Sequence, residues 1–249
     1  MPVSSMAREV SRAQFHSSRL IRVLEGLAVA DIADSRQSFG ERLAQWLDFK
    51  DAISLYSVLH GDLSDGASRS PAVGARSPQE ELRRVRDSLI EAIRTDTQLD
   101  LHEAADGANL SSDVEGEFLP YHRAYLTHQR SMQSALGGLR AQVRAALAER
   151  SASGRRLAAL DSVLEQSLAA RERSLLALLP VLLRKHFEHL LLTRGSVIAE
   201  DSIQEAPFGG WLPGFCRDVQ AVLIAELDLR LQPVFGLMDA LGKGVTEQQ

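Results

Sequence analysis

The chain has 249 residues, of which 45% are hydrophobic, and its formal net charge at pH 7 is −5. This length is enough to bury a sizeable core, and the single cysteine, Cys216, excludes an intramolecular disulfide. The net acidity argues against binding nucleic acid or acidic membranes over the whole surface, although a local basic patch stays open.

Two features bear on location. No charged-then-apolar signal segment opens the sequence, which favours a cytoplasmic protein. The longest nearly uncharged apolar run, residues 174–183, has about half of the roughly twenty residues that a membrane-spanning helix needs. We therefore expect no direct membrane insertion.

Three Ser-x-x-Glu patterns predict helix N-termini. In such a capping box, the serine and glutamate side chains each accept a hydrogen bond from the other residue's backbone amide. The pairs are Ser38 with Glu41, Ser77 with Glu80, and Ser112 with Glu115.

The first 60 residues predict a small N-terminal helical module. Apolar residues between 20 and 27 recur at helical spacing, and a second helix is expected after Ser38. Asp51 is expected to cap a third short helix, whose apolar side carries Leu55, Tyr56 and Leu59. Residues 61–77 are rich in Gly, Ser, Asp, Ala and Pro and predict a flexible linker.

The remainder, residues 78–249, predicts an elongated helical bundle. A helix over 78–99 precedes a long antiparallel hairpin (113–193), whose arms 113–150 and 154–193 are joined by a tight polar turn. Residues 207–215 are too rich in Gly and Pro for regular structure, and a last helix is expected over 217–241, bent or interrupted at Pro233. No alternating strand pattern occurs in the sequence, so the predicted fold class is all-α.

The first arm of the hairpin is amphipathic. Its predicted apolar stripe consists of Tyr121, Tyr125, Met132, Leu136, Leu139 and Val143. Away from that stripe lie four arginines, namely Arg123, Arg130, Arg140 and Arg144. Between residues 118 and 160 there are seven arginines and one acid, so these four form a candidate anion or nucleic-acid face. The alternative is an ordinary solvated helix face.

The aromatic residues Phe208, Trp211 and Phe215 form a second candidate site. Aromatic residues make up only 5% of the chain, so three within eight positions stand out. As an exposed loop they would anchor a protein partner, and as a loop clamped over the hairpin they would be ordinary core.

No motif typical of catalysis is present. His186 and His189 are spaced to share one helix face, but a zinc site needs further ligands for which no motif is visible. The sequence contains no phosphate-binding Gly-rich loop, nucleophile elbow or paired-cysteine spacing. We therefore expect no catalytic, metal or cofactor residues. An enzyme of unfamiliar type stays open as an alternative to a protein-binding or DNA-binding function.

Four stretches, residues 34–47, 128–140, 170–189 and 225–234, resemble an uncharacterised proteobacterial family, a domain of unknown function. The resemblance covers nearly the whole chain apart from the two polar linkers. Members are typically encoded beside MotA-like and MotB/OmpA-like membrane proteins, which is also the arrangement of the third type of Zorya antiphage defence systems.

The resemblance implies a cytosolic accessory of a proton-driven membrane motor. Its partners would be a second soluble accessory protein, the cytosolic part of the MotA-like complex, or both, and DNA is also possible. Two functions therefore stay open: an adaptor that acts through protein–protein contacts, and a DNA-binding effector that uses the arginine face.

Overall fold

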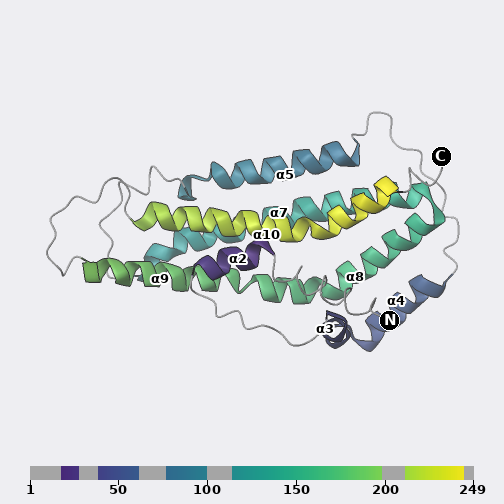
Figure 1. The fold of residues 1–249 in the computed structure, drawn as a ribbon, viewed down its shortest axis with the longest axis horizontal. Helices are drawn as coiled ribbons and strands as arrows, with labels where there is room; N and C mark the ends of the chain where they lie inside the picture. The colour runs from purple at the N-terminus through teal and green to yellow at the C-terminus, as the bar shows by residue number, and fades with distance from the viewer. Residues whose placement is uncertain (1–17, 28–38, 62–76, 100–113, 198–210, 244–249) are drawn as a thin grey trace, which may run out of the picture. The chain divides into compact units, whose positions relative to one another are not determined.

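The computed structural model describes residues 18–27, 39–61, 77–99, 114–197 and 211–243 (Figure 1). Within these ranges every regular element is a helix, which confirms the all-α class. The helices are α2 (Arg19–Gly26), α3 (Phe39–Trp46), α4 (Phe49–His60), α5 (Pro78–Arg94), α7 (Val114–Arg150), α8 (Ala152–Leu176), α9 (Leu179–Val197) and α10 (Trp211–Lys243), with a 3-10 turn, η1 (Thr97–Leu99).

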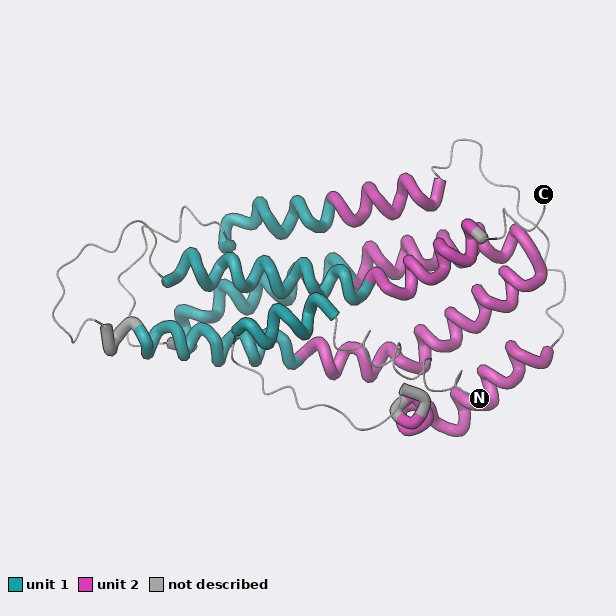
Figure 2. The backbone as a smooth tube through the Cα atoms, viewed as in Figure 1, with its two compact units in different colours: residues 1–33, 88–132, 178–230 teal, residues 34–87, 133–177, 231–249 magenta. Residues whose placement is uncertain are grey.

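The chain divides into two compact units (Figure 2). Unit 1 comprises residues 1–33, 88–132 and 178–230, and unit 2 comprises residues 34–87, 133–177 and 231–249. Helices α5, α7 and α10 contribute residues to both units. Each unit combines segments that are distant in the sequence, so neither unit is a continuous stretch of the chain.

The N-terminal helices contact later parts of the chain. In unit 1, Arg19 of α2 forms an ion pair with Asp228 of α10 at 2.8 Å. In unit 2, the guanidinium carbon of Arg171 on α8 lies 5.4 Å from the centre of the Trp46 ring, and α4 packs along α8. The first 60 residues therefore do not pack only against themselves.

Side-chain caps determine where two helices begin. Ser77 and Glu80 form the predicted capping box, with hydrogen bonds of 3.2 and 3.0 Å between side chains and backbone amides. The cap of α4 was predicted wrongly: Asp48 is the capping residue, and Asp51 is its reciprocal partner inside the first turn. Ser38 and Ser112 lie outside the described residues, as does most of the predicted linker.

The turn of the hairpin is shorter than predicted. Ser151 alone separates α7 from α8, and its hydroxyl accepts a hydrogen bond from the Gly154 amide at 2.9 Å. Gly154 therefore belongs to the first turn of α8. A Cβ atom at this position would lie 2.2 Å from the backbone oxygen of Leu147, so only glycine permits this close approach of the two helices.

The second arm, predicted as one segment, is two helices. Ala177 and Leu178 separate α8 from α9. Pro180 is the second residue of α9. If α8 continued through it, the proline ring would clash with the carbonyl of Leu176, and the missing amide hydrogen would remove one hydrogen bond of the helix. The break therefore has a local cause in the sequence.

Helix α10 begins earlier than predicted. It starts at Trp211, so the expected irregular segment is wrong for residues 211–215. Pro213 is accommodated because a residue in the first helical turn has no intrahelical acceptor for an amide hydrogen. The helix also continues without interruption through Pro233.

The predicted apolar stripe of α7 contributes to the core of each unit. Five of its six residues, all except Tyr121, are at most 6% exposed. In unit 1 they are Tyr125 and Met132, and in unit 2 they are Leu136, Leu139 and Val143. The helical spacing of these residues was therefore a correct guide to burial.

A buried carboxylate lies in the core of unit 1. Glu226 of α10 is 0% exposed and accepts hydrogen bonds from the Tyr125 hydroxyl at 2.7 Å and from the Gln129 amide at 3.0 and 3.1 Å. Arg230 forms an ion pair with the same carboxylate at 2.8 Å. Burial, followed by the effect of Glu226, raises the pKa of the Tyr125 hydroxyl well above its ordinary value. The network joins α7 to α10 with the carboxylate fully bonded.

Candidate functional site

The four candidate arginines of α7 lie in two different environments. Arg123 and Arg130 belong to unit 1, where both are exposed, and neither side chain forms an ion pair with the residues that the structure describes. Thr127, which lies between them on the same side of the helix, is also exposed. These two arginines remain candidates for contact with an anionic partner.

Arg140 and Arg144 belong to unit 2 and are held by two carboxylates of α8. Arg140 binds Asp161 through two hydrogen bonds of 2.8 and 2.6 Å. Arg144 binds Asp161 at 3.0 Å and Glu165 at 2.5 Å. Both arginine side chains are less than a fifth exposed. This α7–α8 ion-pair cluster joins the two arms of the hairpin, so the arginine face is not continuous.

The two arginine charges of the cluster are balanced by the carboxylates of Asp161 and Glu165. Burial opposes the charge on Arg144, but its hydrogen bonds with Glu165 and Asp161 outweigh that effect and raise the pKa of the guanidinium. A phosphate approaching this site would compete with two carboxylates that are already in place. The contact is therefore suited to holding the hairpin together.

We expect Asp161→Ala to lower the free energy of unfolding by about 2 kcal/mol. The two guanidinium groups would keep only Glu165, and a partly buried charge that loses its partner costs less than a fully buried one. Urea unfolding followed by circular dichroism measures the change. Glu149→Ala removes an exposed acid from the same hairpin and should change stability by less than about 0.5 kcal/mol. Equal effects of the two substitutions would contradict a structural role for the cluster.

The described members of the aromatic trio lie in helix α10. Phe215 is 0% exposed and lies 5.0 Å from Phe187 and 5.4 Å from Tyr121, measured between ring centres. Trp211 is partly buried and lies 5.0 Å from Phe187. Burial is the main cause that raises the pKa of the Tyr121 hydroxyl to about 12, and the charges of the nearby Cys216 and Glu117 side chains act in the same direction. Phe215 is therefore core, and Phe208 lies outside the described residues.

The paired histidines do not share a site. His186 is buried, and its Nε2 lies 2.8 Å from an Asp218 oxygen, while its Nδ1 has no hydrogen-bond partner among the residues that the structure describes. The geometry favours the tautomer in which Nε2 carries the hydrogen and donates it to Asp218. His189 is exposed. Among the described residues, no three His, Cys, Asp or Glu side chains gather in a way that could hold a metal ion.

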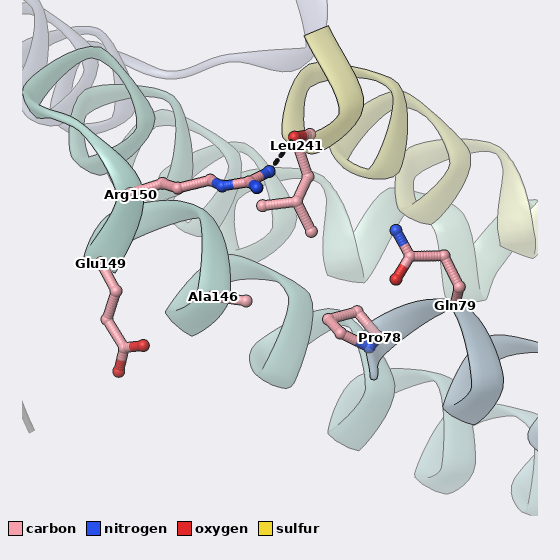
Figure 3. Close-up of a pocket in the computed structure, with 6 residues that line it drawn as sticks. All are labelled: Pro78, Gln79, Ala146, Glu149, Arg150 and Leu241. Carbon is pink, nitrogen blue, oxygen red and sulfur yellow. Dashed lines mark hydrogen bonds between the residues drawn. The ribbon is translucent and has the colours of Figure 1, made fainter. Parts of the chain in front are cut away.

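A hollow of about 350 Å³ lies in unit 2 (Figure 3). It is lined by Pro78, Gln79, Ala146, Glu149, Arg150 and Leu241. Arg150 donates a hydrogen bond to the backbone oxygen of Leu241 at 2.5 Å, and the Glu149 side chain points away from that guanidinium. The polar groups of the lining are the Gln79 amide, the Glu149 carboxylate and the Arg150 guanidinium, which is already bonded to the backbone of Leu241.

Helix α4 presents an exposed apolar surface that the sequence analysis missed. Its residues and exposed fractions are Phe49 at 81%, Ile53 at 54%, Tyr56 at 64% and Leu59 at 46%. We call this surface the α4 face. Tyr56 and Leu59 were expected on the packed side, but the side toward α8 carries Asp51, bound by Ser167 at 2.7 Å. Apolar residues occur on more than one side of this short helix, so their spacing alone did not show which side would face α8.

A second exposed surface lies on α9 in unit 1. Leu178, which directly precedes α9, and Val181 and Leu192 within it are 55, 51 and 75% exposed, and Lys185 and His189 lie between Val181 and Leu192 on the same side of the helix. We call these five residues the α9 face. Leu179, Leu183 and Phe187 of the same helix are buried, so the α9 face is the outward side of an element that is well packed on its other side.

In the part of the chain that the structure describes, the helices fall short of the length and apolarity that crossing a membrane requires. No curated protein matches the sequence at a significant level, and neither does any solved structure. The profile of the family described as Protein of unknown function (DUF3348) matches residues 6–243, and the chain belongs to that family.

Proposed function

We propose that this chain is a non-enzymatic accessory protein that acts by binding another protein through the α9 face. The observation that supports this most is the exposure of Val181 and Leu192 on a helix whose other side is buried, together with that of Leu178 directly before the helix. Exposed apolar side chains that cluster on one side of a rigid element are typical of protein-binding sites. Lys185 in the middle of the face favours a partner that places a carboxylate opposite it.

The resemblance to a family encoded beside MotA-like and MotB/OmpA-like proteins suggests where the partner belongs. We propose a cytosolic adaptor of such a proton-driven membrane complex, with a role in antiphage defence. The partner would be the cytosolic part of the MotA-like protein or a second soluble accessory protein. This assignment rests on the genomic setting of the family, and the α9 face supplies the surface.

DNA binding is the alternative function, and Arg123 and Arg130 are the observation that favours it. Two exposed arginines two helical turns apart can reach few phosphates, and affinity for DNA rises with the number of phosphates neutralised. Arg140 and Arg144 already form ion pairs with Asp161 and Glu165. The two α7 arginines that remain therefore support weak, salt-sensitive binding at most.

We expect Val181→Glu combined with Leu192→Glu to abolish recovery of the partner protein. The full-length tagged chain would be purified from its native host with and without the neighbouring gene products, and bound proteins identified by mass spectrometry. Both positions are exposed, so circular dichroism should show unchanged helix content. The matched control, Ser131→Glu with Ser134→Glu, adds the same charge at exposed polar positions of α7 and should retain the partner.

The same preparation separates the two functions. If Arg123→Glu with Arg130→Glu abolishes DNA retention at physiological salt, and the α9 variant keeps every protein partner, the adaptor function is wrong and the DNA-binding alternative holds. If neither variant changes any bound partner, both functions fail.

A further inference from the structure

The α4 face is a separate surface in unit 2, and its chemistry narrows what can bind it. At 100° per residue, Phe49, Ile53 and Tyr56 of the α4 face and the neighbouring His60 lie within an arc of about 60°, and Leu59 lies about 60° beyond its edge. The rings of Tyr56 and His60 stack with their centres 4.2 Å apart. No carboxylate lies within this arc, and Lys50 is the single lysine or arginine of the helix. An anionic surface such as DNA or acidic lipid would find one cation here and would bind weakly.

We propose that the partner of the α4 face is the α4 face of a second copy of this chain, in an antiparallel, two-fold contact. In that arrangement Phe49 lies opposite His60 of the other copy, and Ile53 lies opposite Tyr56. Each contact occurs twice, as two-fold symmetry requires. The two Lys50 side chains then lie at opposite ends of the contact.

The exposed area sets the strength of this contact. If each large side chain offers about 200 Å², the four exposed fractions leave roughly 500 Å² of apolar surface on each copy. Complete burial of this surface on both copies would remove at most roughly 1,000 Å² from water, which is below the roughly 1,200 Å² of stable interfaces and in the range of weak, transient ones. A reversible dimer, whose population depends on concentration, follows from this area.

The α4 helix is held in place independently of the second copy. The hydrogen bond from Ser167 is the main cause that lowers the pKa of Asp51, followed by the bond from the Asp48 amide. The carboxylate therefore fixes the start of the helix to α8 in the single chain. The α4 face is thus presented before association, so dimerisation does not require α4 to fold on binding.

Sedimentation of the purified full chain over a wide concentration range tests the contact. We expect the dimer fraction to rise with concentration for the wild type, and Phe49→Glu with Tyr56→Glu to remain monomeric throughout. Val181→Glu with Leu192→Glu places the same change on the α9 face and should dimerise like the wild type. A wild type that stays monomeric at the highest concentration overturns the proposal. So does an α4 variant that dimerises as strongly as the wild type.

Cross-linking tests the antiparallel register. Cys216 is 0% exposed, so introduced cysteines will dominate the reaction with a short bifunctional maleimide. Chains with Phe49→Cys, mixed with chains with His60→Cys, should cross-link far more than either chain with itself. Two copies of position 49 would be roughly 16 Å apart in the antiparallel pair, at 1.5 Å per residue. Predominant linkage of like with like, or equal linkage of all pairs, contradicts the proposed arrangement.

Different results would contradict the α4 dimer and the α9 adaptor surface. Loss of the protein partner from the α4 variant, together with a monomeric wild type, would assign the α4 face to another protein and overturn the dimer. Dimerisation with no change in partner recovery from the α9 variant would overturn the adaptor surface and leave the dimer standing.

Discussion

Phe187→Ala is expected to lower the free energy of unfolding by about 3 to 5 kcal/mol. Phe187 is 0% exposed, and its ring centre lies between 5.0 and 6.0 Å from those of four other aromatic residues. These neighbours are Phe118, Tyr121, Trp211 and Phe215. Truncation would remove the side chain that all four contact and leave a cavity in unit 1.

Chemical denaturation followed by circular dichroism measures the loss. Tryptophan fluorescence, measured with Trp46 replaced by Phe so that only Trp211 contributes, reports the local change because the Trp211 ring packs directly on Phe187. Phe49→Ala is the matched control, since it makes the same substitution at a side chain that is 81% exposed. Measured at a concentration where the protein is monomeric, the control should cost less than about 0.5 kcal/mol. Comparable losses at the two positions would show that the aromatic cluster is not the core of unit 1.

Glu226→Ala is expected to destabilise the fold by a similar amount, about 3 to 5 kcal/mol. The carboxylate is the common acceptor for Tyr125, Gln129 and Arg230, and its removal would take a buried hydrogen bond from each of these three donors. The Tyr125 side chain is 1% exposed, and leaving a buried donor without its acceptor costs more than losing the bond itself.

Equilibrium unfolding in urea, monitored by circular dichroism, gives the value for Glu226→Ala. Asp239→Ala removes an exposed acid from the same helix and should be nearly neutral. Glu226→Gln keeps an acceptor oxygen while removing the charge, so it should lie between the two. A Glu226→Ala protein as stable as the wild type would mean that the network is not closed in solution.

Local sequence signals predicted the helices well because they depend on nearby residues. The capping box at Ser77 needs only a glutamate three positions later, and the structure contains both of its hydrogen bonds. The apolar stripe from Tyr125 to Val143 followed from helical periodicity alone. Composition was a poor guide at residues 211–215, where the high Gly and Pro content predicted irregular structure. The segment instead begins helix α10, and its aromatic side chains pack against α9.

The candidate site was harder to predict because its chemistry depends on contacts between distant residues. The stretch of residues 118–160, in which seven arginines and one acid were counted, ends one residue before Asp161. Asp161 is the carboxylate that binds Arg140 and Arg144. Charge on one helix carries no information about acids on the helix that will face it. Likewise, the periodicity of α4 could not say which of its apolar sides would meet α8 and which would stay exposed.

The one-residue link at Ser151 has a consequence for how this chain can change in length. Because α8 starts directly after α7 ends, the distance of each side chain from the link decides which partner it meets on the other arm. An insertion in one arm alone would both rotate and displace Asp161 relative to Arg140. Equal insertions of seven residues in both arms, nearly two full turns, would restore the facing pairs. Variation in length along this hairpin is therefore expected to be symmetrical, with gains and losses matched between its arms.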